Sequence, residues 1–153
     1  KLRDEHYQAM IASTTKLNTP GAKLATLPAV HALTDVTGFG LFGHVREMAE
    51  RSGVRISLDA QSIPALPGAL AVAGEGVRTG GDGRNRDFAA KVLELDGIPE
   101  ELVALGYDPQ TAGGLLVSIP AGKAAVLAAR FQEEGLFLAR VGKVEEGSGV
   151  AVS

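Results

Sequence analysis

Apolar residues recur at helical spacing along much of the chain. In residues 3–17 they fall three or four positions apart, as on one side of an α-helix, and this face consists of Tyr7, Met10, Ile11, Thr14 and Leu17. A second stripe of this kind follows a glycine-rich run and is formed by Leu41, Phe42, Val45, Met48 and Ala49. The pattern predicts two amphipathic helices, the second ending near Ser52-Gly53, since glycine is a common helix stop.

Short helices are predicted over residues 20–27 and 67–73, where proline can occupy the first turn, and over 99–105. An alanine-rich helix is predicted over 120–134, ended by Gly135. Alternating apolar and polar residues predict a half-buried strand over 54–58. Further strands are expected over 28–35, 92–95, 115–119, 137–141 and 150–152. The stretch 74–83 contains five glycines and is expected to be a loop, either mobile or ordered by an anion.

Because helices and strands are interleaved, the predicted fold class is an α/β (α+β) sandwich with a mixed sheet flanked by helices. The 153 residues form one predicted domain, 1–153, and suffice for a buried core. The chain starts at Lys1, directly in a helical pattern, and has few candidate catalytic side chains. We therefore expect it to be part of a larger protein.

The amino-acid composition argues against several classes of function. A net charge of -3 leaves no basic surface for nucleic acid. The sequence has neither a targeting leader nor an apolar run of about 18 residues, so no membrane span is expected and the default location is cytoplasmic. With no cysteine, the chain cannot supply a thiol nucleophile or a thiolate metal site.

The glycine-rich run allows a dinucleotide site as one reading. Gly38, Gly40 and Gly43 form a literal G-x-G-x-x-G between a predicted strand and a helix, and Asp59 follows at the spacing of a ribose-binding carboxylate. Against NAD binding, Asp35 precedes the first glycine and would repel a pyrophosphate.

Asp35 itself has two other readings. It can be a ligand for Mg²⁺ in a phosphate site, because hard divalent cations prefer carboxylate oxygens. Alternatively, Asp35 and Thr37 can cap or brace the turn that leads into the helix.

Two long motifs resemble those of a known family. Residues 34–44, TDVTGFGLFGH (the first signature), and residues 108–116, DPQTAGGLL (the second signature), look like the signatures of the C-terminal domain of selenophosphate synthetases. The order of residues 10–18, 67–69, 80–86 and 141–144 also agrees, so the resemblance covers essentially the whole chain. The wider superfamily includes aminoimidazole ribonucleotide synthetase, thiamine-monophosphate kinase and a hydrogenase maturation protein.

The resemblance implies an ATP-dependent enzyme that converts selenide and water to selenophosphate, releasing AMP and phosphate. It implies a homodimer when full length and a separate N-terminal ATP-binding domain, which carries the nucleophilic cysteine or selenocysteine, a lysine and most Mg²⁺ ligands. The isolated chain is then expected to be inactive. A sibling ATP-dependent enzyme of the superfamily and a non-catalytic interaction module are the alternatives.

By resemblance, Asp35 is the one metal ligand in this chain. Residues placed near the phosphates or substrate are Thr37, Gly38, Gly40, Asp108, Thr111, Gly113 and Gly114, although backbone geometry alone could also require these glycines. The second signature has Ala112 where the family usually has serine, which weakens a phosphate role at that position.

Other polar residues have weaker assignments. Arg84, Asn85 and Arg86 could meet an anion or an adjacent domain, or form an exposed basic loop. His44 could donate to an anion, but a structural role is the more frequent one. His6 and His31 belong to no motif.

Overall fold

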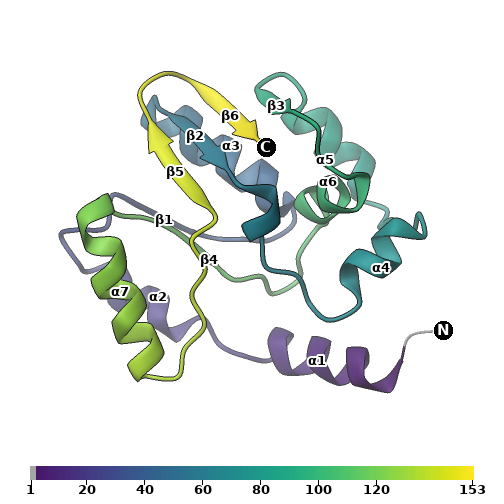
Figure 1. The fold of residues 1–153 in the computed structure, drawn as a ribbon, viewed down its shortest axis with the longest axis horizontal. Coiled ribbons are helices and arrows are strands. Elements are labelled where there is room, and N and C mark those ends of the chain that lie inside the picture. The colour runs from purple at the N-terminus through teal and green to yellow at the C-terminus, as the bar shows by residue number, and fades with distance from the viewer. Residues whose placement is uncertain (1–2) are drawn as a thin grey trace.

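The computed structural model describes residues 3–153, which form helices and strands in mixed order (Figure 1). The helices are α1 (Asp4–Thr14), α2 (Thr19–Leu24), α3 (Gly40–Ser52), the 3-10 helix η1 (Ala60–Ser62), α4 (Ala69–Gly74), α5 (Asp82–Ala89), α6 (Glu100–Tyr107) and α7 (Ala121–Glu133). The strands are β1 (Ala32–Asp35), β2 (Arg55–Leu58), β3 (Leu93–Leu95), β4 (Leu115–Ser118), β5 (Gly142–Glu145) and β6 (Gly149–Val152).

The larger sheet has four strands in the order β3-β6-β2-β5. It is mixed, because β6 runs parallel to both β2 and β3, whereas β5 is antiparallel to β2. In β2 and β6 alternate residues are buried, so one face of the sheet belongs to the core. The other face carries polar pairs such as Arg55 with Glu94 and Ser57 with Glu145.

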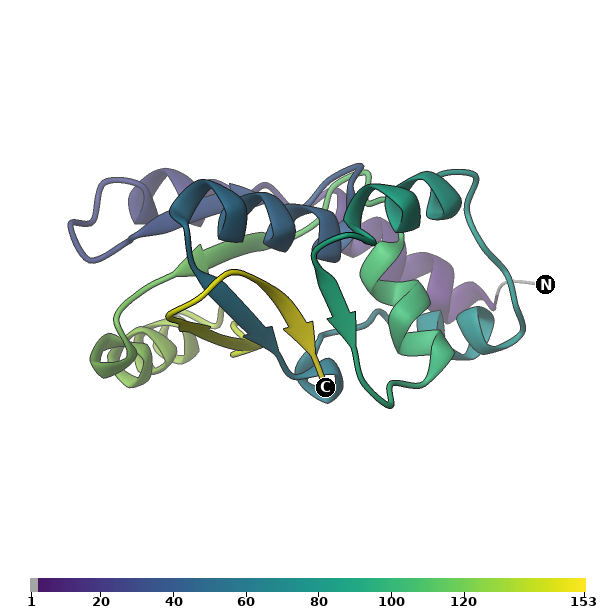
Figure 2. The same cartoon turned by 90° about the horizontal axis from the view of Figure 1, so that it is seen from above.

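The core lies between this sheet and helices α3 and α6. Figure 2 shows α3 lying across the sheet, with α5 and α6 beside it. Phe42 and Val45 of α3 and Val150 and Val152 of β6 are at most 1% exposed. Full burial of such side chains contributes about 1.5–3 kcal/mol each, so this contact holds α3 against the sheet.

Strands β1 and β4 form a separate two-stranded antiparallel sheet. Its register pairs Asp35 with Leu115, so the end of β1 lies beside the start of β4. The two signatures, separated by more than sixty residues in the sequence, are therefore neighbours in space.

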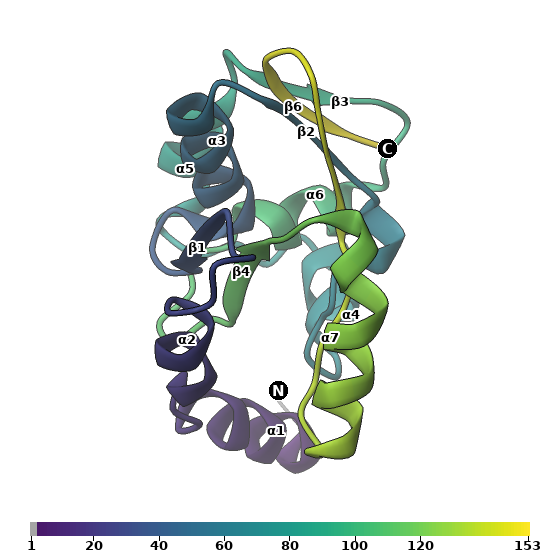
Figure 3. The ribbon, with the colours of Figure 1, turned by 90° about the vertical axis from the view of Figure 1, so that its left-hand side faces the viewer.

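Helices α1 and α7 lie toward the opposite end of the molecule from the four-stranded sheet (Figure 3). Neither helix has a buried residue, although both carry apolar side chains. Tyr7 of α1, Val126 of α7 and, beyond α7, Phe137 are exposed.

The predicted mixed sheet and most predicted elements are confirmed, with four corrections. The glycine-rich stretch 74–83 was expected to be a loop, but α5 begins within it at Asp82. No strand forms over 137–141; β5 begins at Gly142 instead, where it can pair with Leu58 of β2. The first helix ends at Thr14, before Leu17, and β4 is half-buried instead of buried.

The topology argues against a dinucleotide site. The fingerprint requires neighbouring parallel strands on either side of the helix, but β1 and β2 belong to different sheets. The side-chain carboxylate of Asp59 accepts a hydrogen bond from the backbone N–H of Gln61 at 3.0 Å and so caps η1. The NAD-binding alternative is not supported by this fold.

Candidate functional site

The two signatures are joined through their backbones. The N–H of Val36 donates to the carbonyl oxygen of Gly114 at 2.9 Å, and that of Gln110 donates to the carbonyl oxygen of Thr37 at 3.0 Å. A Cβ atom on Gly113 would lie 2.1 Å from the oxygen of Val36, so only glycine fits there. The two signatures, which the sequence predicted as separate loops, are thus joined into one surface by the fold.

Asp35 lies at the end of β1 with an exposed side chain. Within residues 3–153 its carboxylate accepts no hydrogen bond and forms no ion pair, so it does not brace the turn. An exposed carboxylate at the end of an ordered strand is free to bind a cation.

His44 holds the turn that follows Asp35. The N–H of Thr37 donates to Nε2 of His44 at 3.0 Å, and the Thr37 hydroxyl lies 3.2 Å from the same nitrogen. On its other side, Nδ1 of His44 faces a carboxylate oxygen of Glu47 at 3.8 Å. His44 is 8% exposed, and these contacts brace the turn between Thr37 and the first turn of α3.

The phosphate-binding candidates of the first signature differ in how accessible they are to a ligand. Thr37 uses both its N–H and its hydroxyl on His44. Gly38 is exposed, and its N–H meets no acceptor within the described chain. A Cβ atom on Gly38 would meet nothing within 4 Å, whereas Gly40 and Gly43 are closely packed. Gly38 is therefore the glycine with free space for a ligand to approach.

In the second signature, Thr111 and Gly114 are exposed, and Gly114 likewise has open space around it. Asp108 is partly buried, and this burial raises the pKa of its carboxyl, with a further contribution from the charge of Asp82. Gln110 donates to Asp108 at 3.1 Å. Ala112 is exposed, so a serine hydroxyl at this position would face solvent.

In the predicted basic loop, residues 84–86, the side chains of Asn85 and Arg86 are bound to other groups of the chain. Arg86 donates to Asp82 and to Glu100, each at 2.7 Å, and its guanidinium lies 5.0 Å from the centre of the Tyr107 ring. Asn85 is 5% exposed and bonds to two backbone carbonyls. Arg84 is exposed. The sequence placed Asn85 in a motif but did not predict that its side chain connects distant segments of the chain. No local pattern distinguishes a buried amide side chain from an exposed one.

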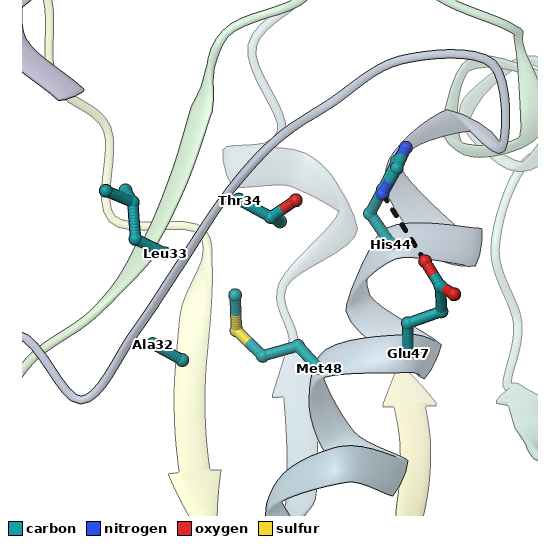
Figure 4. Close-up of a pocket in the computed structure, with 6 residues that line it drawn as sticks. All are labelled: Ala32, Leu33, Thr34, His44, Glu47 and Met48. Atoms are coloured by element: carbon teal, nitrogen blue, oxygen red, sulfur yellow. Dashed lines mark ion pairs between the residues drawn. The ribbon is translucent and has the colours of Figure 1, made fainter. Parts of the chain in front are cut away.

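Figure 4 shows the hollow beside β1 and α3, with Thr34 on one side and His44, Glu47 and Met48 on the other. Its volume is about 140 Å³, below the roughly 300–1,000 Å³ of typical ligand pockets. A hollow of about 440 Å³ lies at the far end of α3, between Gly53 and Lys91, away from both signatures.

No group of three or more potential metal-ligating side chains (His, Cys, Asp or Glu) occurs within residues 3–153. In the same part of the chain, no helix is both long and apolar enough to cross a membrane.

Comparison with known proteins gives consistent matches. The family described as AIR synthase related protein, C-terminal domain, matches residues 12–153. A selenide, water dikinase of Burkholderia ambifaria is 46% identical over 92% of this chain and 40% of its own length. One of Pseudomonas straminea is 44% identical over 96% of this chain and 42% of its own length. The chain thus spans about two fifths of the length of these relatives.

Two solved structures have a similar fold. E. coli HypE, a hydrogenase maturation protein, matches 92% of this chain and 37% of its own with a TM-score of 0.64 and 21% identity. Thiamine-monophosphate kinase of Stenotrophomonas maltophilia matches 81% of this chain and 31% of its own with a TM-score of 0.54 and 22% identity. At such identities the likeness concerns the fold alone.

Proposed function

Because the chain belongs to the family of the AIR synthase related protein C-terminal domain, we propose that it serves as the C-terminal domain of a selenophosphate synthetase. The main support is the set of selenide, water dikinases that are 41–46% identical to nearly all of this chain. The proposed reaction uses ATP, selenide and water and gives selenophosphate, AMP and phosphate. The proposed setting is the cytoplasm, where ATP is available.

Asp35 is proposed as a ligand for Mg²⁺. Its carboxylate is exposed and lacks a partner within the described residues, and the N–H of Gly38, three positions later in the chain, also meets no acceptor there. Mg²⁺ would offset negative charge on the polyphosphate during transfer. Residues 3–153 contain no group of three candidate side-chain ligands, so we propose that further ligands of this site come from the N-terminal domain, from phosphate oxygens and from water.

Phosphate or substrate contacts are proposed at Gly38 and on the second signature at Thr111 and Gly114, where backbone and side-chain donors are exposed. Asp108 lies on the same joined surface. Thr37, Gly40 and Gly113 are proposed to act indirectly, since they maintain the turn and the contact between the signatures.

An N-terminal ATP-binding domain is the proposed partner. Two observations support it: this chain covers only 40–42% of the length of these relatives, and no described residue of α1 or α7 is buried. The homodimer of the full-length protein stays a prediction.

The test uses the full-length protein with phosphorus NMR of ATP consumption, with and without selenide. We expect the wild type to form AMP and selenophosphate only with selenide, and Asp35→Asn to lower this rate by about 100-fold or more, because a ligand of the charge-stabilising metal is lost. Asp59→Asn is the matched control, since the amide oxygen can still cap η1, and its rate should stay near the wild type.

Three other results would each contradict one part of this proposal. An unaffected Asp35→Asn variant would remove the metal role and keep the family. ATP consumption without selenide dependence would favour a sibling enzyme of the same superfamily. Selenophosphate formed by the 153-residue chain alone would contradict the need for a second domain.

A further inference from the structure

Asn85 connects three segments that are distant in the sequence. It lies in α5 and is 5% exposed. Its side-chain nitrogen donates to the carbonyl oxygen of Gly38 at 2.9 Å and to that of Tyr107, at the end of α6, at 2.8 Å. Both N–H groups of one amide are thus used on the backbone of the first signature and on the residue that precedes the second.

The segments that Asn85 connects are in close contact. Gly40 has a φ of +67°, and a Cβ atom there would lie 2.8 Å from the carbonyl oxygen of Gly106 and from the carbonyl carbon of Tyr107. The turn after Asp35 is therefore pressed against the end of α6. Carbonyls at a helix end have no partner within the helix, and Asn85 supplies one for Tyr107.

Asn85 is itself held in place by its neighbours in α5. Arg86 donates to Asp82 and to Glu100 of α6, and its guanidinium lies over the Tyr107 ring. A Cβ atom on Gly81 would lie 2.5 Å from Pro109 of the second signature. Helix α5 is thus fixed against α6 and the second signature, and the amide of Asn85 points at its two acceptors from a rigid position.

The turn that follows Asp35 is consequently held from two sides. His44 binds the N–H of Thr37, and Asn85 binds the carbonyl of Gly38. We propose that Asn85 is a positioning residue that keeps the Asp35 carboxylate oriented for Mg²⁺. This inference rests on the proposed function, because it assumes that Asp35 is a metal ligand.

Without the amide of Asn85, the carbonyl of Gly38 loses its partner and the turn gains freedom. The Asp35 carboxylate must then be ordered at the moment when the cation binds, which weakens binding. Outer partners that orient a metal ligand typically change metal affinity by about 10–100-fold when they are removed.

The test uses Asn85→Ala in the full-length protein, with activity measured as a function of Mg²⁺ concentration. We expect the Mg²⁺ concentration for half-maximal rate to rise about 10-fold, while the rate at saturating Mg²⁺ stays within about twofold of the wild type. Asn18→Ala is the matched control: Asn18 also donates from its amide to a signature carbonyl, that of Gly113 at 3.0 Å, but it is exposed. It should change neither quantity.

A second readout does not depend on activity. Amide hydrogen exchange measured by mass spectrometry should become faster over residues 36–41 in Asn85→Ala, while residues 55–58 of β2 stay protected. If the alanine variant fails to fold, Asn85→Ser leaves a smaller cavity and one donor, and it should give a smaller shift in the same direction.

The outcomes separate the two proposals. An Asn85 variant with faster exchange over 36–41 but an unchanged Mg²⁺ requirement would overturn the positioning role if Asp35→Asn shows the metal dependence. If Asp35→Asn leaves the Mg²⁺ requirement unchanged, the metal assignment is wrong and the positioning role fails with it. Unchanged exchange over 36–41 would refute the inference directly.

Discussion

At the scale of single residues, the structure separates groups that serve the fold from groups left free. His44 and Asn85 are buried and hold the first signature. Asp35 and Gly38 are exposed and have groups without partners in the described chain. A turn that is braced by other residues can present a carboxylate and an N–H to a ligand without losing its own conformation.

Asp108 is neither fully buried nor fully exposed. Its partial burial raises the pKa of its carboxyl above the ordinary value of 3.8. A carboxyl with a raised pKa in the folded state binds its proton more tightly there than in the unfolded chain. Its charged form therefore destabilises the fold, most fully above the raised pKa, and this effect disappears as the pH falls below the unfolded value.

We accordingly expect Asp108→Asn to raise the free energy of unfolding at pH 7, by less than about 1 kcal/mol since the side chain is only partly buried. Urea unfolding at pH 7 and at pH 4.5 checks this, and the gain should be smaller at the lower pH. A variant that is less stable than the wild type at both values would contradict the burial argument. A more stable but less active variant would indicate that the carboxylate serves the reaction.

At the scale of elements, the start of α3 is decided by its glycines. A Cβ atom on Gly43 would lie 2.7 Å from the Cβ of Phe39, and one on Gly40 would lie 2.8 Å from the backbone of α6. Two of the three glycines of G-x-G-x-x-G are thus explained by packing, without any pyrophosphate. Gly38 alone among them has open space.

Gly40→Ala is expected to destabilise the protein by about 2–5 kcal/mol, because a left-handed residue gains a side chain and that side chain meets backbone atoms. Gly38→Ala is the matched control in the same motif, with a change within about 0.5 kcal/mol. Urea unfolding of both variants measures the difference. Equal effects would show that the close approach to α6 is not what requires glycine.

At the scale of the whole molecule, α3 and the four-stranded sheet lie at one end, β1 and β4 lie in the middle, and α1 and α7 lie toward the other end (Figure 3). Val126 is 56% exposed and Phe137 is 70% exposed. We propose that the second domain packs over these side chains, as partner surfaces do over exposed apolar patches.

The double substitution Val126→Ser with Phe137→Ser should change the free energy of unfolding of the 153-residue chain by less than about 0.5 kcal/mol. In the full-length protein it should cost about 2 kcal/mol or more, because burial of these side chains against the second domain is lost. Thermal and urea unfolding of both forms make the comparison, with Lys123→Ser on the same helix as the control. Equally small effects in both forms would argue that this surface stays uncovered.

The sequence by itself determined what depends on local pattern. Apolar spacing predicted α3 and β2 close to their observed bounds, and α1 except for its last turn, because helical and strand periodicity are written directly into neighbouring positions. The alanine-rich run between Pro120 and Gly135 predicted α7. The two signatures and the family also followed from contiguous residues. Asp35 was singled out in this way, and its exposed carboxylate is compatible with the predicted role.

Only the tertiary structure decided what depends on residues far apart in the chain. Helix α5 was missed because Asp82, Gly83 and Asn85 are poor helix formers; it is stabilised by the Asp82–Arg86 pair and by burial of Asn85. The bond from Asn85 to Gly38 spans 47 positions. Such contacts have no local signal, since their free energy comes from surfaces that meet only after the chain has folded. The pairing of β1 with β4, which brings the signatures together, was decided in the same way.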